Sequence, residues 1–303
     1  MSVPTQKPAP LRRGDLIGIA APAAAVDAAA VATGVHALEQ LGFRVHVGNA
    51  VFRRAGYLAG RDRERLDDLV EMFRNPGVKA IVAARGGYGS GRLLPLLDPA
   101  LAREHPKIVV GFSDLTFLLN DLLQRAGLVT FHGPMATSLA EHPQAAARLA
   151  RALTGDRRDW NLSARDVIQP GTAEGVTVGG CLSVLVAMLG TPYAVETDGR
   201  ILFLEDANEK PFRVDRMLTQ LRQAGKLDRV AGVVFGEMPG CVAHPDEAVT
   251  VRDVVAEAFA GADYPVAFGL PTGHGVGSVT LPLGIRARLA GERLTLLESP
   301  LAE

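Results

Sequence analysis

Ser113 has the sequence setting of a nucleophile. The apolar residues 108–110 before it are typical of a short buried strand, and the leucines after it recur every three or four positions, as in a helix. A serine on so tight a turn projects its hydroxyl away from the backbone, at the end of the helix where N–H groups are unpaired. Enzymes that transfer acyl groups place their nucleophile at such a turn. Serine also caps many helices without doing chemistry, so the assignment depends on partners further along the chain.

A serine nucleophile needs a base, which is most often a histidine oriented by a carboxylate. The chain has seven histidines. His274 stands between glycines in residues 271–277, after an expected strand at 266–268, where core packing gives little reason for a histidine. His132 ends another expected strand, 128–131, and is the second candidate. The loop position favours His274 as the base.

Glu205 is the best placed carboxylate. It ends the apolar strand expected at 201–204 and is followed by Asp206. Because side chains alternate along a strand, Glu205 and Asp206 should point to opposite faces, so only one of them should reach the site. A salt bridge to Arg213 or Arg216 would explain the same glutamate without any catalysis, and both explanations stand at this point.

Glycines crowd residues 85–92, which follow a third expected strand. Their spacing, G-x-G-x-G, does not match a dinucleotide fingerprint, and the lysine of a phosphate loop is missing. Glycine lets backbone N–H groups turn toward a ligand, although a tight turn alone would also need it. The functional interpretation is an oxyanion hole, in which the N–H of Gly87 or a neighbour is one donor and the N–H of Asp114 is the other. Arg85 or Arg92 could bind a substrate carboxylate, and the sequence does not choose between them.

The first half of the chain alternates strands with helices. Expected strands are 16–21, 43–47, 80–84, 108–110 and 128–131, and expected helices are 26–41, 62–73, 93–97 and 143–153, with a further helix after Ser113. This alternation predicts an α/β fold, with a mostly parallel sheet covered by helices on both faces. Ligands bind such sheets beyond the carboxyl ends of the strands, where both the glycine stretch and Ser113 lie.

The length of 303 residues predicts about two domains. The regular pattern dissolves into charged and turn residues after position 154, so we place a linker at 155–173. An N-terminal α/β domain, 1–154, would carry the nucleophile, and a C-terminal domain, 174–303, would carry the acid and the base. Expected elements of the second half are strands 201–204, 230–235 and 266–268, helices 182–189, 211–221 and 251–259, and a hairpin of 284–289 with 293–297 around Gly291 and Glu292. The site would then be a cleft between the two domains.

Composition excludes several other classes of protein. The net charge of −1 gives no electrostatic footprint for nucleic acid or for a membrane surface. Cys181 and Cys241 are too few for a disulfide scaffold, indicate a reducing compartment, and have no metal-site spacing. Arg12 and Arg13 precede an apolar stretch, but the uninterrupted run 16–21 is shorter than the ~7–15 residues of an export signal. No run approaches the ~18 apolar residues of a membrane span. We therefore expect a cytoplasmic protein.

Several short blocks, in one order along nearly the whole chain, match a known family. They are ARGGYG at 84–89, GFSDLT at 111–116, HGPM at 132–135, GGCLS at 179–183, LGTPY at 189–193, LED at 204–206, PFRVDR at 211–216, GH at 273–274 and LPLG at 281–284. In these blocks the chain resembles the serine LD-carboxypeptidases, which include muramoyl-tetrapeptide carboxypeptidase and the microcin C self-immunity proteins. Separate blocks in the right order are far more specific than any single motif.

The resemblance implies two domains, the first similar to class I glutamine amidotransferases and the second smaller and partly a β-barrel. It carries the family's nucleophile to Ser113, its acid to Glu205 and its base to His274, the residues that the local argument favours. No cofactor or metal is implied, and a homodimer is expected. Cys181 stands where the family usually has asparagine, which we interpret as a packing change. Leu115 replaces the second glycine of G-x-S-x-G, which argues against an ordinary α/β-hydrolase esterase.

The activity implied by the resemblance is that of a serine carboxypeptidase that releases a C-terminal D-amino acid, D-alanine, from murein tetrapeptide in peptidoglycan recycling. The expected partner is a small peptide, bound with help from Arg85, Tyr88 or Arg92. Two alternatives stay open: a microcin-type hydrolase that cleaves peptidyl- or aminoacyl-nucleotides, and a non-catalytic protein that binds muropeptides. Nucleotide recognition would favour a stacking aromatic residue, and the single tryptophan, Trp160, falls in the expected linker.

Overall fold

The chain forms two compact units. The computed structural model describes residues 3–244, 248–276 and 278–303. Unit 1 comprises Met1–Asp159, Val279–Gly284 and Ser299–Glu303, and unit 2 comprises Trp160–Ser278 and Ile285–Glu298. This division differs from the boundaries expected from the sequence, because two C-terminal segments group with unit 1.

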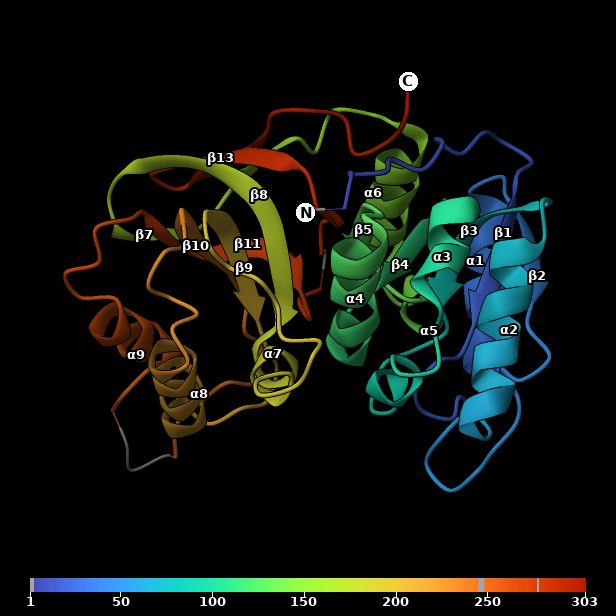
Figure 1. Ribbon diagram of the computed structural model, residues 1–303, viewed down its shortest axis with the longest axis horizontal. Coiled ribbons are helices and arrows are strands. Elements are labelled where there is room, and N and C mark those ends of the chain that lie inside the picture. The colour runs from blue at the N-terminus through green and yellow to red at the C-terminus, as the bar shows by residue number, and fades with distance from the viewer. Residues whose placement is uncertain (1–2, 245–247, 277) are drawn as a thin grey trace. The chain divides into compact units, whose positions relative to one another are not determined.

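Unit 1 is built on a six-stranded sheet with the order β12-β5-β4-β3-β1-β2 (Figure 1). The strands are β1 (Leu16–Ala20), β2 (Arg44–Val47), β3 (Val78–Ala83), β4 (Ile108–Gly111), β5 (Thr130–His132) and β12 (Leu281–Leu283). β1 to β5 are parallel, as the sequence predicts, and β12 runs antiparallel to β5. The strand order reverses between β1 and β3, which is the point where open α/β sheets bind ligands.

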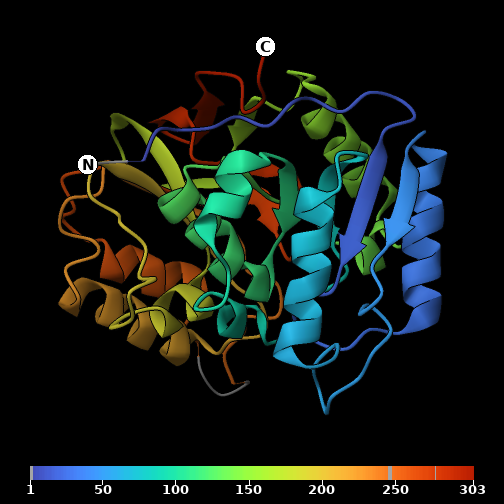
Figure 2. The same cartoon turned by 45° about the vertical axis from the view of Figure 1, so that its right-hand side comes forward.

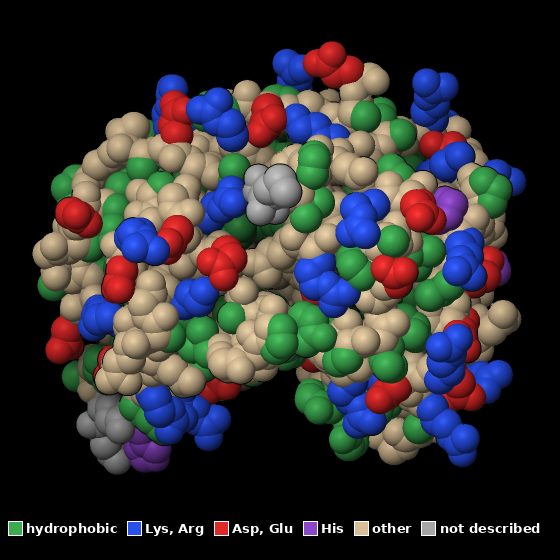
Figure 3. All heavy atoms as spheres, viewed as in Figure 1, with side chains coloured by type: hydrophobic (Ala, Val, Ile, Leu, Met, Phe, Trp, Pro, Cys, Tyr) green, Lys and Arg blue, Asp and Glu red, His purple; other side chains and the backbone are tan. Residues whose placement is uncertain are grey.

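Helices cover both faces of this sheet. They are α1 (Ala28–Gln40), α2 (Asp62–Arg74), α3 (Pro99–Glu104), α4 (Thr116–Ala126), α5 (Ala136–Leu139) and α6 (Pro143–Thr154). α1 packs with α5 and α6, whereas α2 packs with α3 and α3 with α4. Figure 2 shows β1 and β2 between α1 and α2. β2 lies on one side of β1 and β3 lies on the other, so successive connections cross the sheet in opposite directions. Because connections between parallel strands are right-handed, α1 and α2 therefore lie on opposite faces. The outward face of α2 is rich in charged side chains (Figure 3).

One short helix is not where the sequence places it. The helix expected at 93–97 is instead a 3₁₀ turn over Ser90–Leu93, and α3 lies just beyond the expected range. The start of α3 is marked by Asp98, whose side chain accepts the N–H of Ala100 at 2.9 Å, and by a proline in the first turn. An aspartate followed by proline is typical of a helix start, so the sequence does carry the information.

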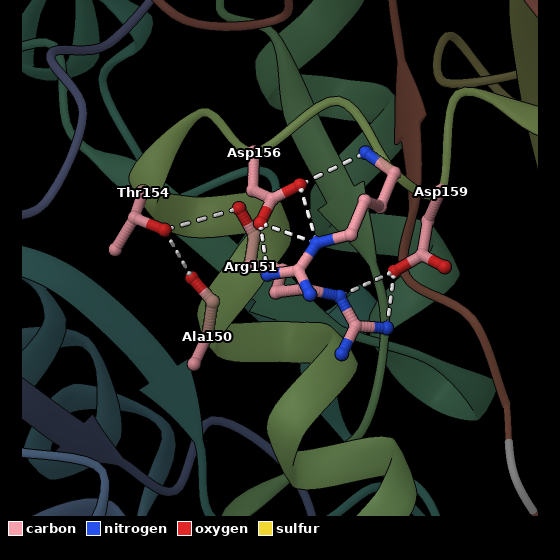
Figure 4. Close-up of polar contacts among 6 residues, drawn as sticks. Ala150, Arg151, Thr154, Asp156 and Asp159 are labelled. Atoms are coloured by element: carbon pink, nitrogen blue, oxygen red, sulfur yellow. Dashed lines mark hydrogen bonds and ion pairs between the residues drawn. The ribbon is translucent and has the colours of Figure 1, made fainter.

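Local polar contacts fix the end of α6 (Figure 4). Gly155 ends the helix with a φ of 84°, as left-handed C-terminal glycines do. The Arg151 guanidinium donates to the carboxylate of Asp159 at 2.7 Å, and that of Arg158 donates to Asp156 at 2.5 Å. The first residues of the expected linker are therefore tied to unit 1.

Unit 2 is built on an eight-stranded mixed sheet with the order β6-β14-β13-β8-β9-β10-β11-β7. The strands are β6 (Asn161–Ser163), β7 (Asp166–Gln169), β8 (Thr172–Cys181), β9 (Arg200–Glu205), β10 (Gly232–Glu237), β11 (Val266–Gly273), β13 (Arg286–Ala290) and β14 (Arg293–Leu296). β8 to β11 are parallel and the remaining pairs are antiparallel. Three helices, α7 (Leu182–Ala187), α8 (Pro211–Gln223) and α9 (Val251–Ala258), pack one against the next.

β6 and β7 occupy the stretch expected to be a linker. They are the two edge strands of the sheet, and only Ala164 and Arg165 separate them. The N–H of Ala164 donates to the carbonyl of Glu292, and that of Arg165 donates to the carbonyl of Phe268, so the two edges of the sheet lie next to each other. The linker expectation is wrong over 161–169, because strands this short leave little periodicity in the sequence.

The C-terminal part of the chain contributes to both units. The predicted hairpin is confirmed, since β13 and β14 pair around Gly291, whose φ is 57°. The residues before the hairpin form β12, in which Leu281 and Leu283 are buried in unit 1. An uninterrupted C-terminal domain over 174–303 is therefore not what the structure has. Within the described part of the chain, no helix combines the length and apolar character that crossing a membrane needs.

Gly34 gives a test of how closely α1 packs on α5. Alanine normally stabilises a helix interior relative to glycine by ~1 kcal/mol. A Cβ on Gly34 would overlap the backbone carbonyl of Ala136, the first residue of α5. We therefore expect Gly34→Ala to lower the free energy of unfolding by about 1–3 kcal/mol in urea denaturation. Thr33→Ala, on the exposed side of the same helix, is the matched control and should change stability by less than ~0.5 kcal/mol. A Gly34→Ala protein as stable as this control would contradict the packing.

Candidate active site

Ser113 sits on a strained turn between β4 and α4. Its φ is 60°, a left-handed value shared, among the non-glycine residues that the structure describes, with Asn208 alone. Phe112 before it is extended, with a φ of −154°, so the chain passes from strand to 3₁₀ turn within one residue. A left-handed conformation costs an L-residue about 1–2 kcal/mol, and such strain gathers at functional sites. The predicted strand-to-helix turn is therefore present, in the geometry that exposes a nucleophilic hydroxyl.

Asp114 ties the glycine loop, residues 85–91, to this turn. Its buried carboxylate accepts the N–H groups of Gly89 at 3.2 Å and of Ser90 at 2.8 Å. Its backbone carbonyl accepts the Ser90 hydroxyl at 2.6 Å. β3 and β4 are neighbouring parallel strands, so these bonds join the two loops at their carboxyl ends.

Gly86 is the glycine that faces Ser113. A Cβ on Gly86 would lie 3.0 Å from the Ser113 Cβ and 3.4 Å from the backbone nitrogen of Asp114, so a larger residue would crowd the turn. The sequence indicates Gly87 as the donor, and Gly87 has a φ of 100°. No acceptor for the Gly87 N–H is found in the described parts of the chain. The Asp114 N–H is in the first turn of a helix, where such groups are unpaired. Backbone donors are thus present on both loops beside Ser113.

A buried arginine supports the glycine loop from the other side. The side chain of Arg65 is fully buried and donates to the carbonyls of Pro22 and Gly89, the latter at 2.9 Å. Arg65 also pairs with Asp62 at 2.6 Å, and Asp62 pairs with Arg92 at 2.9 Å. Burial raises the pKa of Asp62, but the hydrogen bonds from Arg92 and Arg65 outweigh it and hold this pKa below its usual value. The sequence does not indicate this network, because a charged residue in an amphipathic helix normally faces water.

In unit 2, a buried carboxylate orients a histidine. Glu205 ends β9 and is fully buried. One of its oxygens accepts the Nδ1–H of His274 at 2.6 Å and the backbone N–H of His274 at 3.2 Å. Gly273 has a φ of 112°, and a Cβ there would lie 2.7 Å from the same carboxylate oxygen. Glycine therefore allows the chain to pass this close, and the structure brings together the carboxylate and the histidine singled out from the sequence.

Burial and the hydrogen bond together set the protonation of this pair. Burial raises the pKa of Glu205, and the hydrogen bond from His274 offsets only part of the effect. Burial lowers the pKa of His274, but the hydrogen bond and the charge of Glu205 outweigh it, so this pKa is raised. With Nδ1–H directed at the carboxylate, the neutral ring carries its basic lone pair on Nε2. The ring can take up a proton there, and the carboxylate stabilises the imidazolium that results.

Asp206 has other hydrogen-bond partners than Glu205, in line with the expectation from strand alternation that only one of the two acids reaches the histidine. The Asp206 carboxylate accepts the N–H of Ser183 at 2.8 Å, at the start of α7. Cys181 lies opposite Glu205 in the pairing of β8 with β9, with its Sγ 3.3 Å from the Ser183 hydroxyl. Burial, helped by the charges of Glu205 and Asp206, raises the pKa of the Cys181 thiol well above its ordinary value. A thiol that stays protonated is a poor nucleophile, which agrees with a packing role.

The alternatives raised by the sequence lie in other surroundings. His132 is buried in β5, with its ring edge-to-face against Phe112 at 6.0 Å between centroids. Arg213, one of the two arginines considered as partners of Glu205, pairs with Glu209 at 3.4 Å, whereas Glu205 binds His274. Across the described residues, no group of three or more histidine, cysteine or acidic side chains is placed to hold a metal ion.

The substrate-binding candidates lie on the glycine loop and just after it. Arg85 and Tyr88 are exposed on the loop, and Arg92 is exposed in the 3₁₀ turn that follows. The ring of Tyr88 packs edge-to-face on Tyr57, with 5.7 Å between centroids. Tyr57 comes from the loop after β2, and no sequence pattern indicates it, since a lone loop tyrosine has no periodicity to follow.

Known proteins resemble the chain over nearly its whole length. A model of the LD-carboxypeptidase N-terminal domain matches residues 17–133, and one of the LD-carboxypeptidase C-terminal domain matches residues 174–289. A probable murein peptide carboxypeptidase of Bacillus subtilis is 39% identical over 98% of this chain and 96% of its own. The crystal structure of muramoyltetrapeptide carboxypeptidase from Oxalobacter formigenes has a TM-score of 0.82 and 32% identity, covering 93% of this chain and 97% of its own. The microcin C7 self-immunity protein MccF, in its wild-type apo state, has a TM-score of 0.90 and 26% identity, covering 98% of this chain and 100% of its own.

The fold is that of a two-domain α/β protein with mixed sheets flanked by helices, like MccF. The chain belongs to the LD-carboxypeptidase family, because both domain models match it in order and a relative with 39% identity spans it. The resemblance drawn from the separate motif blocks is thereby confirmed.

The strain at Ser113 can be measured apart from any activity. Ser113→Ala removes the hydroxyl and keeps a Cβ at a φ of 60°, whereas Ser113→Gly removes both the hydroxyl and the strain. We expect the free energy of unfolding, measured by chemical denaturation, to be about 1 kcal/mol higher for the glycine variant than for the alanine variant. This order reverses the usual cost of glycine. A glycine variant less stable than the alanine variant would show that the turn stores no strain.

Proposed function

We propose that the protein is a serine carboxypeptidase that cleaves the amide bond between an L-centre and a D-amino acid, releasing C-terminal D-alanine from murein tetrapeptide in peptidoglycan recycling. The observation that carries the proposal is the buried 2.6 Å hydrogen bond between His274 and Glu205, in a member of the LD-carboxypeptidase family that also holds Ser113 on a strained turn. The name of the Bacillus subtilis relative, a probable murein peptide carboxypeptidase, supports the substrate class.

Ser113 acts as nucleophile, His274 as base, and Glu205 as the carboxylate that orients the base. Nε2 of His274 takes the hydroxyl proton as Ser113 Oγ attacks the amide carbonyl, and Glu205 stabilises the imidazolium. The imidazolium then protonates the leaving amine, and water hydrolyses the acyl-enzyme with the same histidine as base. Ser113 belongs to unit 1 and His274 to unit 2. Proton transfer requires Oγ of Ser113 and Nε2 of His274 to come within ~3 Å of each other.

The N–H groups of Gly87 and Asp114 receive the oxyanion in this mechanism. Each donor of this kind contributes on the order of 3 kcal/mol to transition-state stabilisation. The contact of Gly86 with Ser113 supports the glycine loop as the source of one donor. The Asp114 carboxylate and Arg65 hold that loop through Gly89, so in this proposal they are positioning residues.

Arg85 is the residue that we propose for the C-terminal carboxylate of the substrate. Arg92 already pairs with Asp62, whereas Arg85 is exposed and makes no hydrogen bond to another described residue. An arginine fork binds a carboxylate through two parallel hydrogen bonds, which fixes the orientation of the substrate terminus. Tyr88, on the same loop, would line the substrate beside it.

We also propose the finer features that the family resemblance implies: a glutamine amidotransferase-like unit 1, a partly barrel-like unit 2, a homodimer, and a cytoplasmic location. Five parallel strands with a serine after β4 support the first, and the adjacent edges formed by β6 and β7 support the second. Cys181 and Cys241 are buried thiols, which supports a reducing compartment.

A microcin-type hydrolase is the second candidate. Solved structures of MccF include complexes with adenosine monophosphate and with glutamyl sulfamoyl guanosine. The observation that favours this candidate here is the exposed pair Tyr57 and Tyr88, on which a nucleobase could stack. A non-catalytic muropeptide-binding protein on the same fold is the third, and the Glu205–His274 hydrogen bond argues against it.

The substrate test compares tetrapeptides that end in D-alanine and in L-alanine and are otherwise identical. A pocket shaped for the D-methyl group pushes an L-methyl group into its wall, so discrimination arises from steric exclusion. We expect D-alanine release with a kcat/KM at least about 100-fold higher than for the L-isomer. Comparable values for both, or turnover of nucleotide-linked substrates alone, would replace this proposal with the second candidate.

Ser113→Ala and His274→Ala should each lower kcat by roughly 10³-fold or more. The melting temperature should change little in Ser113→Ala and fall in His274→Ala, which stays folded but leaves Glu205 buried without its hydrogen bond to the imidazole ring. Both residues lie on turns or loops and are only partly buried, so little packing is lost. His132→Gln is the control, since His132 is the other histidine raised by the sequence. Loss of activity in the His132 variant together with an active His274 variant would mean that the base is misassigned.

The pH profile of kcat/KM tests the role of Glu205. The base must be neutral, so activity falls as the pH drops through the pKa of His274; because that pKa is raised, the midpoint should lie above ~6.5. Glu205→Gln removes the charge that raises it and keeps the burial that lowers it. We expect the midpoint to move to lower pH and kcat to fall by roughly 10³–10⁴-fold.

Asp206→Asn is the matched control for Glu205→Gln. Asp206 accepts a hydrogen bond at the start of α7 and makes a smaller contribution to the pKa of His274. Its variant should keep most of the activity and show a smaller shift of the midpoint in the same direction. Equal shifts and equal losses in the two variants would refute the assignment of Glu205.

A further inference from the structure

A pocket of unit 1 lies beside the glycine loop and is not used by the mechanism above. Its volume is about 530 Å³. It is lined by Ala55, Tyr57, Leu58, Arg61, Asp62, Arg63 and Arg92. These residues come from the loop after β2, from the start of α2 and from the 3₁₀ turn after the glycine loop. Lys and Arg side chains gather on this side of the molecule, over α2 and the loop at its lower end (Figure 3).

The pocket has an excess of positive charge. The single carboxylate among its lining residues, Asp62, forms ion pairs with the buried Arg65 and with the exposed Arg92. Arg63 pairs with Asp67 at 2.9 Å on the surface of α2. The side chain of Arg61 is exposed and, in the described ranges, makes no hydrogen bond or ion pair, although the Arg61 backbone N–H, donated to the Glu64 carboxylate, and the Arg61 charge both lower the pKa of Glu64. One guanidinium of the wall is thus available to an anionic ligand, and a second, Arg92, keeps part of its donor fork.

Two exposed tyrosines stand at the rim. Tyr57 is 64% exposed and Tyr88 is 51% exposed, and their rings meet edge-to-face. What distinguishes these two rings from other exposed apolar side chains is that they touch each other beside a pocket, and contiguous exposed apolar surface of this kind is typical of binding sites. Aromatic rings beside arginines suit a ligand that carries an anionic group next to an apolar chain or ring.

The pocket is connected to the nucleophile through one loop. A Cβ on Gly89 would lie 2.5 Å from the side chain of Leu58, so the loop packs directly on the pocket wall. Gly86, at the other end of the same loop, faces Ser113. All of these residues belong to unit 1. The glycine loop follows β3 and Ser113 follows β4, and these two strands are neighbours in the sheet. A substrate attached at Ser113 could therefore extend along the loop into the pocket.

We propose that this pocket binds an internal carboxylate of the stem peptide, with the carboxylate on Arg61 and Arg92 and the adjoining aliphatic chain on Tyr57. The inference rests on the proposed function, because a murein tetrapeptide carries carboxylates before the scissile bond as well as at its C-terminus. The α-carboxylate of its γ-linked D-glutamyl residue lies outside the peptide backbone and is the group that we assign. Asp62 in the wall disfavours a doubly charged phosphate more than a singly charged carboxylate.

The test uses two tetrapeptides that differ only in this carboxylate, one carrying the D-glutamyl acid and the other the corresponding carboxamide. We expect the wild-type protein to prefer the acid by about tenfold in kcat/KM, mainly through KM, because a charge-assisted hydrogen bond is lost in the amide. Arg61→Gln should remove this preference by weakening turnover of the acid alone. Arg54→Gln is the matched control, since Arg54 is an exposed arginine of the same loop outside the pocket lining, and it should keep the preference.

Two readouts keep the pocket and the reaction apart. D-Alanine release at equal rates from acid and amide, in wild type and in Arg61→Gln, would overturn the pocket assignment and leave the carboxypeptidase proposal standing.

If neither peptide is hydrolysed, the carboxypeptidase proposal fails, and calorimetric binding of both peptides to Ser113→Ala decides whether the pocket assignment holds. Tighter binding of the acid that is lost in Ser113→Ala/Arg61→Gln supports it, and equal binding overturns it. Binding of adenosine monophosphate that Arg61→Gln weakens, without any acid preference, would make this a nucleotide pocket and overturn the assignment.

Discussion

The carboxylate of Asp114 is the contact on which the rest of unit 1's site depends. It accepts two backbone N–H groups of the glycine loop, while its own backbone continues directly from Ser113. Asp114 is part of the strained turn and also binds the glycine loop, so the turn and the loop are tied together. Arg65 adds a third point of attachment from α2, through the carbonyl of Gly89. A loop of glycines, which would otherwise sample many conformations, is thus fixed beside the serine without needing bulky side chains of its own.

The arrangement in unit 2 is built on close approach and burial. Glu205 is fully removed from water, which penalises its charge, and the hydrogen bond from His274 offsets part of this penalty. Gly273 brings the backbone of the next residue within reach of the same carboxylate oxygen, so the histidine is held by its ring and by its main chain. Asp206, the residue directly after β9, accepts a hydrogen bond at the start of α7. Two adjacent acids thus bind different partners, in line with the alternation of side-chain direction along a strand.

The sequence predicts the features that depend on local pattern and fails for those that depend on distant contacts. The parallel strands of unit 1, the turn at Ser113, the hairpin at Gly291 and the pairing of Glu205 with His274 all leave periodicity, turn residues or strand ends that can be read directly. Arg65 could not be found this way, since nothing in its helix distinguishes a buried arginine from an exposed one. β6 and β7 were hidden because three- and four-residue strands carry too few positions to show alternation.

The path of the chain has a consequence for how the protein can be divided. The chain leaves unit 1 after Asp159, returns for Val279–Gly284, leaves again, and returns for its last residues. A fragment that stops before β12 would leave the outer edge of β5 with unpaired backbone groups, and Leu281 and Leu283 would be missing from the apolar core beside it. An open sheet edge is a template for association with other chains. The N-terminal half made alone should therefore be prone to aggregate, and a soluble version would need those six residues joined back onto it.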